Sequence, residues 1–230
     1  MCSALSAYAQ DEEVPEYHTE YDYGINWNTN GGLIGGGMFK YVQRRTENTY
    51  RHFGVEIVNV KHYKELTYPG SQNSPFIANK LNYLFVVRPQ YGREFLLFRK
   101  APEDGVQINA IIAGGPSIGL IKPYFIELYD PNNPTEPNKE VVYDPSKHNL
   151  GYIAGAGSPF DGIDMIKTRY GIHAKASLSF EFGSVSGSVI GAELGFLGEA
   201  YKHSIPLMYQ ATNRGVFGSA FLTLYYGSKK

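Results

Sequence analysis

A strict two-residue alternation between Ile172 and Phe182 constrains the fold more than any other feature of this sequence. Every even position in this stretch is apolar, and every odd position carries a polar or charged side chain, from His173 to Glu181. Successive side chains of a β-strand point to opposite faces, so the pattern predicts a strand with one apolar face. Residues 190–196 repeat it after a Gly/Ser link, which predicts a hairpin.

The same alternation recurs along most of the chain. It is found in residues 21–27, 53–57, 81–87, 106–128 and 216–226, and a Gly-rich strand is expected from Leu33 to Arg45. The parity is kept across Gly114, Gly115 and Pro116, which favours one long bent strand and a total of eight strands. A turn at that point would raise the count to ten, and residues 94–99 are an additional short candidate.

Composition excludes several classes of protein. The chain has 230 residues, of which 43% are hydrophobic and 19% charged, so it is not a disordered chain. It contains no apolar run of about 18 residues, which excludes a membrane-spanning helix. The formal net charge of −1 provides no basic field for nucleic acid.

The expected connections fall into two classes. Residues 46–49 and 183–188 are tight links, whereas residues 65–75, 130–149 and 201–214 are long and rich in Pro, Asn and Gly. An antiparallel membrane barrel has short turns at one end and long loops at the other, and only the short turn at Asn28–Gly32 departs from this arrangement.

The charge pattern indicates which face of the sheet is turned outward. In a soluble barrel the apolar face points inward, whereas in a membrane barrel it meets lipid and the charges lie inside. Here the apolar face carries almost no charge, and the opposite face carries scattered charges of both signs. We therefore expect a closed, antiparallel, up-and-down transmembrane β-barrel, with a soluble lipocalin-like carrier as the alternative. The expected luminal charge network consists of Glu56, Lys80, Arg88, Lys175, Glu181 and Glu193.

Aromatic residues near the expected strand ends suit the two membrane interfaces, where amphipathic rings settle. The candidates for these girdles are Tyr21, Trp27, Tyr41, Tyr124 and Tyr226.

The amino terminus indicates export. Small residues at Ala7 and Ala9 resemble a signal-peptidase site, so residues 1–10 are interpreted as the remnant of a secretory signal peptide. Residues 11–19 are then a periplasmic lead segment, and residues 20–230 form the barrel. The only cysteine, Cys2, would be removed with the signal, which excludes disulfides and thiol chemistry.

Several stretches resemble a poorly characterised outer-membrane β-barrel family of Bacteroidota. They are residues 54–62, 80–92 and 115–124, together with residues 221–227, which look like the closing strand that the barrel assembly machinery recognises. The resemblance implies a bacterial outer-membrane location and, as one possibility, an accessory role in a protein-export complex. It implies no catalytic residues.

No motif in the sequence indicates catalysis, a cofactor or a metal. The six histidines have neither zinc-finger nor metalloprotease spacing, and the Gly-rich stretches lack a following Lys-Ser/Thr. His173 shares a face with Ser177 and Glu181, but that face is expected to line the lumen. We therefore expect a structural or protein-interaction component that contacts outer-membrane lipid and binds a protein through its long loops. A small porin-like channel and a lipid-A-modifying enzyme remain alternatives.

Overall fold

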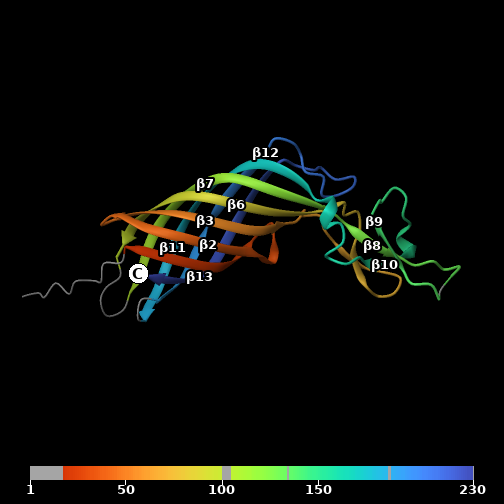
Figure 1. The fold of residues 1–230 in the computed structure, drawn as a ribbon, viewed down its shortest axis with the longest axis horizontal. Helices are drawn as coiled ribbons and strands as arrows, with labels where there is room; N and C mark the ends of the chain where they lie inside the picture. The colour runs from red at the N-terminus through yellow and green to blue at the C-terminus, as the bar shows by residue number, and fades with distance from the viewer. Residues whose placement is uncertain (1–17, 100–104, 134, 186–187, 230) are drawn as a thin grey trace, which may run out of the picture.

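The computed structural model describes residues 18–99, 105–133, 135–185 and 188–229. Eight of its strands close into an antiparallel barrel in the order β1-β13-β12-β11-β7-β6-β3-β2 (Figure 1). Their bounds are β1 Thr19–Asn28, β2 Gly32–Thr46, β3 Thr49–Val60, β6 Asn82–Phe98, β7 Val106–Pro123, β11 Lys167–Val185, β12 Ser188–Tyr201 and β13 Val216–Lys229. The expected closed eight-stranded barrel is therefore confirmed.

The first and last barrel strands pair with each other, from Glu20 opposite Lys229 to Asn28 opposite Phe221. This pairing closes the wall and leaves both ends of the barrel chain at the same end of the molecule. The paired strand ends Thr46 and Thr49, and Val185 and Ser188, also lie at this end, which we call the terminal end. The long connections lie at the opposite end, the loop end (Figure 1).

The strand from Val106 runs without interruption through Gly114, Gly115 and Pro116, as the unbroken alternation predicts. It ends at Pro123 rather than at the expected Leu128. Residues Phe125–Leu128 form β8, which belongs to a different sheet, because the chain leaves the wall after Pro123. Residues 94–98 are not a separate strand. They continue β6, which pairs with β7 up to Phe98.

Two small sheets stand outside the barrel at the loop end. Strands β8, β9 (Lys139–Val142) and β10 (Ile153–Ala156) form one, which we call the loop sheet, and β4 (Thr67–Pro69) pairs with β5 (Pro75–Ile77) in the other. Two single-turn 3-10 helices, η1 (Leu150–Tyr152) and η2 (Ile163–Met165), flank β10. Phe76, Ala78, Tyr124, Ile126, Tyr143 and Ile153 form a buried core under these sheets.

The wall has the expected register, with apolar side chains outside and charges inside. Leu178 and Leu194 are 41% and 56% exposed, whereas Lys175 and Glu193 are 5% and 1% exposed. A glycine makes room for a large ring inside: a Cβ at Gly191 would collide with the phenol ring of Tyr225. The described residues contain no helix long and apolar enough to cross a membrane.

The predicted signal remnant, residues 1–10, lies outside the described residues. So does the predicted lead segment as far as residue 17, and its last residue, Thr19, already belongs to β1.

Candidate functional site: the charged lumen and its apolar plug

Lys175 on β11 is the centre of the luminal charges. Its Nζ lies 2.6 Å from Oε1 of Glu56 on β3 and 3.0 Å from Oε1 of Glu193 on β12. All three side chains are almost completely buried. Taking ions out of water is costly, and close opposite charges with hydrogen bonds offset that cost. The three residues therefore cross-link strands from different sides of the barrel.

Arg88 extends this group toward the loop end. Its guanidinium donates to both carboxylate oxygens of Glu199, at 2.8 and 2.9 Å, and approaches Glu56 at 3.9 Å. Such a bidentate pair fixes geometry as well as charge. Glu199 was not among the predicted network residues, although it has the parity of Glu193 on the same strand and could have been found from that signal.

A second charged group occupies the lumen nearer the terminal end. Lys40 contacts Asp22 at 3.2 Å and Glu94 at 3.0 Å, and Glu94 also contacts His52 at 2.9 Å. Glu181 lies in this half of the lumen, where it accepts hydrogen bonds from Lys229 at 2.7 Å and from Asn109 at 3.0 Å. The lumen therefore holds cations and carboxylates along much of its length.

The structure brings together Glu56, Arg88, Lys175 and Glu193 from the six predicted network residues. Glu181 has the partners just described. Lys80 requires a correction: it precedes β6, outside the barrel strands, and its Nζ binds Glu65 at 2.6 Å and lies over the Tyr83 ring. The parity that directs Arg88 inward does not apply to Lys80, because Lys80 lies before β6 begins at Asn82.

Only some of the five predicted girdle residues are exposed on the outer wall. Tyr21 and Tyr226 are 37% and 42% exposed on the outer wall, where the Tyr21 ring lies 5.0 Å from that of Tyr41. Trp27 and Tyr41 are half-buried. Tyr124 is not a girdle residue, because it lies beyond β7 in the core under the small sheets and is 1% exposed. Burial raises its pKa to about 12, and its hydroxyl accepts a hydrogen bond from the Ile77 N–H at 2.9 Å.

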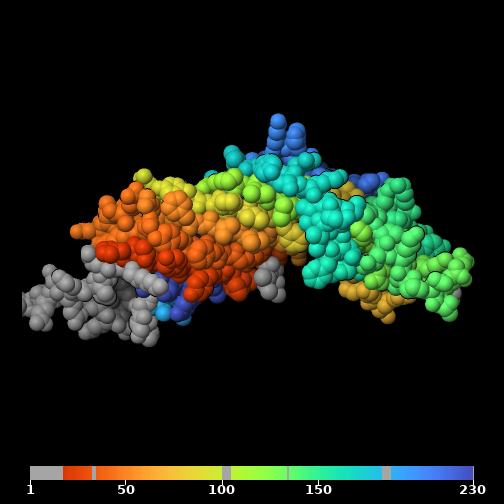
Figure 2. All heavy atoms as spheres, in the orientation of Figure 1, coloured from red at the N-terminus to blue at the C-terminus, as the bar shows by residue number. Residues whose placement is uncertain are grey.

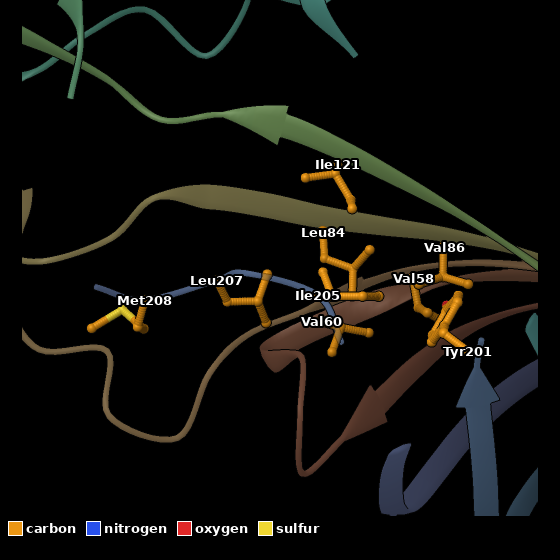
Figure 3. Packing of buried hydrophobic residues seen from close by; sticks show 9 residues of the cluster. All are labelled: Val58, Val60, Leu84, Val86, Ile121, Tyr201, Ile205, Leu207 and Met208. Carbon is orange, nitrogen blue, oxygen red and sulfur yellow. The ribbon is translucent and has the colours of Figure 1, made fainter. Parts of the chain in front are cut away.

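An apolar cluster, which we call the plug, packs at the loop end of the lumen (Figure 3). The β12–β13 connection places Ile205, Leu207 and Met208 against inward-facing side chains of the wall. The wall residues in this cluster are Val58, Val60, Leu84, Val86, Ile121 and Tyr201. Ile205 and Leu207 are almost completely buried. A packed apolar cluster excludes water, so the plug separates the charged lumen from the loop end.

Backbone hydrogen bonds attach the plug to the far side of the mouth. The Leu81 N–H donates to the Leu207 carbonyl at 2.8 Å, and the Tyr209 N–H donates to the Asn79 carbonyl at 2.8 Å. Asn213 holds the segment in shape: its Oδ1 accepts from the N–H groups of Leu207 and Met208, and its Nδ2 donates to the Met208 carbonyl. One side chain thus satisfies three backbone groups of the plug.

Replacing Asn213 by Ala is expected to loosen the plug without opening the wall. The substitution leaves these backbone groups without their partner, and each lost hydrogen bond contributes about 0.5–1.5 kcal/mol. We expect faster amide hydrogen exchange at Leu207 and Met208, with unchanged exchange in β7 and β11. Asn132→Ala, in an exposed loop, is the matched control, and equal exchange at the plug in both variants would contradict the role of Asn213.

The Ser117–His173 pair, which could resemble a catalytic pair, is buried in the lumen. Ser117 Oγ lies 3.2 Å from His173 Nδ1, but the two residues are 0% and 5% exposed and lie on the barrel side of the plug. The nearby Glu199 binds Arg88. Among the residues that the structure describes, no three His, Cys, Asp or Glu side chains are arranged to hold a metal ion.

Comparison with known proteins adds little to this description. No protein-family model matches the chain, and no curated protein matches it, so the resemblance to a Bacteroidota family stays a prediction. Neisserial surface protein A (NspA) is similar over 93% of this chain and 97% of its own, with 7% identity and a TM-score of 0.40. Ail, the attachment invasion locus protein of Yersinia pestis, is similar over 94% and 99%, with 8% identity and a TM-score of 0.41. The barrel assignment rests on the strand pairing.

Proposed function

We propose that this chain is an integral β-barrel of a bacterial outer membrane, with a filled and plugged interior, and that it serves as a structural or protein-interaction component. The observation that carries the proposal is the outer wall formed by β11, β12 and β13. The outward positions from Tyr170 to Phe182, Ile190 to Ala200 and Val216 to Tyr226 contain no charged residue, and most of their large side chains are exposed.

Such a surface fits lipid better than water. Soluble monomers rarely expose apolar patches larger than a few hundred Å². A closed barrel satisfies the backbone groups of its wall internally, which the hydrocarbon core requires. Arg51 and Arg93 are outward-facing charges on β3 and β6, and both lie toward the terminal end, where charge is less costly.

The interior supports a role other than conduction. An eight-stranded barrel encloses enough space for its own side chains, and here they are ion-paired below an apolar plug. The parts available to a partner are the loop sheet and its flanking turns, where Val142, Leu150 and Tyr152 are 40–54% exposed. Under this proposal the barrel is surrounded by outer-membrane lipid, the assembly machinery inserts it, and a protein partner binds the loop sheet.

Membrane fractionation and gel migration test the location. The full chain expressed with an export signal should sediment with outer membranes and migrate differently in detergent gels before and after boiling, because folded barrels resist detergent. In planar bilayers it should produce no steady conductance. Recovery in the aqueous fraction would refute the membrane location, and ohmic conductance would refute the filled interior. Co-purification of a protein from those membranes that is lost on Tyr152→Ala, and kept on Glu47→Ala in the exposed β2–β3 link at the terminal end, tests the interaction role.

A further inference from the structure

Residues 157–166, which we call the rim segment, connect β10 to β11 and include η2. They are fixed in place by specific contacts. The Lys122 ammonium donates to the carbonyls of Pro159 and Asp161, at 2.6 and 2.7 Å. Gly162 has a φ of +71°, and a Cβ there would collide with the ring of Phe125. The rim segment is therefore a folded part of the surface.

The rim segment lies against the outside of the barrel wall. Lys122 has the parity of Ile118 and Leu120, which face outward on β7, and its Nζ lies over the ring of Tyr83 on the neighbouring strand. Because Lys122 binds carbonyls of the rim segment, those carbonyls lie on the outward side of β7. Figure 2 shows turquoise atoms of this part of the chain on the near face, between the barrel and the loop sheet.

Three apolar side chains of the rim segment point away from the protein. Phe160 is 76% exposed, Ile163 56% and Met165 46%, and Tyr170, near the start of the adjoining strand β11, is 73% exposed. None of the three rim side chains belongs to either buried apolar core. Exposed groups of large apolar side chains are a feature of interaction surfaces.

The position of the rim segment along the barrel axis agrees with the boundary of a bilayer on the side of the loop end. The outward apolar row of β11 runs from Tyr170 to Phe182, which at roughly 3.3 Å per residue and a tilt of about 40° spans about 30 Å along the barrel axis. The apolar band of such barrels is about 25 Å tall. Lys167, the first residue of β11, pairs with Ile121. The rim segment, which ends at residue 166, therefore lies just beyond the loop-end limit of this row.

We propose that the rim segment contacts lipid, and that Phe160, Ile163 and Met165 enter the outer leaflet at the boundary between headgroups and acyl chains. The occupant is lipid because the surface continues the apolar wall directly through Tyr170 and Ile172. Asp164, exposed between Ile163 and Met165, places the segment at the boundary rather than in the hydrocarbon centre. This proposal rests on the membrane location proposed above and adds a lipid contact outside the barrel strands.

A single tryptophan reports the environment of the rim segment. Trp27 is the only tryptophan of the chain, so Trp27→Phe provides a silent background into which Phe160→Trp is introduced. The refolded full chain is placed in phosphatidylcholine vesicles whose acyl chains are brominated near either the headgroup end or the methyl end. We expect blue-shifted emission and loss of fluorescence that is larger with the shallow bromines.

Two control variants separate the possible failures. Leu178→Trp on the wall should be quenched more by the deep bromines. Tyr152→Trp in η1, beside the loop sheet, should emit as in water and remain unquenched. Quenching of Leu178→Trp without quenching of Phe160→Trp would overturn the lipid contact and leave the membrane location standing. An unquenched Leu178→Trp in vesicle-bound, heat-modifiable protein would overturn the membrane location itself. Stronger quenching of Phe160→Trp by the deep bromines would overturn its placement at the boundary.

Discussion

Lys175→Met is expected to lower the free energy of unfolding by about 3–5 kcal/mol, the range observed when one partner of a buried ion pair is removed. Methionine fills much of the same volume, so the main change is the lost charge. Glu56 and Glu193 each lie within 3.0 Å of the Lys175 ammonium, and both are about 1% exposed. Without the ammonium, two buried carboxylates share one site with no cation between them.

Urea titration of the barrel in a detergent or bilayer that allows reversible unfolding would measure this loss. The matched control is Lys147→Met, which removes an exposed ion pair with Asp144 and is expected to cost at most about 1 kcal/mol. Adding Glu193→Gln to Lys175→Met should restore part of the lost stability, because it removes one of the two carboxylates that lose the Lys175 ammonium. Equal stabilities of Lys175→Met and Lys147→Met would contradict a luminal network centred on Lys175.

Leu178→Arg is expected to destabilise the membrane-inserted barrel by about 2–4 kcal/mol, the cost of a cationic side chain facing lipid near the bilayer midplane. Leu178 lies within the outward apolar row of β11 and is 41% exposed, so the substitution places a guanidinium on the outer wall rather than in a packed core. The size of the stability loss therefore indicates whether lipid or water surrounds the wall.

The control for depth is Phe182→Arg, near the terminal end of the same row, where an arginine costs about 0–1 kcal/mol. Both variants are compared with the parent chain by urea titration in phospholipid bilayers. A loss at Leu178 that exceeds the loss at Phe182 supports lipid around the wall. Two equally mild effects would show that the outward row faces water, and the membrane location would then be abandoned.

Much of the barrel could be predicted from alternation, because a strand allows a side chain only two directions. The parity of Leu178 against Lys175 specified inside and outside, and the parity across Gly114, Gly115 and Pro116 supported eight strands. The same argument places Glu56, Arg88, Lys175 and Glu193 on the inner face, and Glu199 could have been added by extending it.

Alternation carries no information once the chain leaves the wall, and the errors lie there. Lys80 and Tyr124 flank strands β6 and β7, just outside their ends, and their side chains are directed by contacts with Glu65 and Ile77. The plug has no periodic signal at all. Ile205, Leu207 and Met208 look like apolar residues of an exposed loop. Apart from Tyr201, the wall residues that bury them lie more than 80 positions away in the sequence.

The path of the β12–β13 connection bears on the order in which the molecule is completed. The segment that seals the mouth joins the last two strands, yet it hydrogen-bonds to the chain near Asn79 and Leu81, which precede the fourth strand of the wall. Until the carboxyl-terminal hairpin has joined the sheet, the upper lumen is open and its lining of Val58, Leu84 and Val86 is wet. Sealing the mouth and closing the wall therefore depend on the same hairpin, and a barrel that lacks it would expose at its mouth the surface that the finished protein hides.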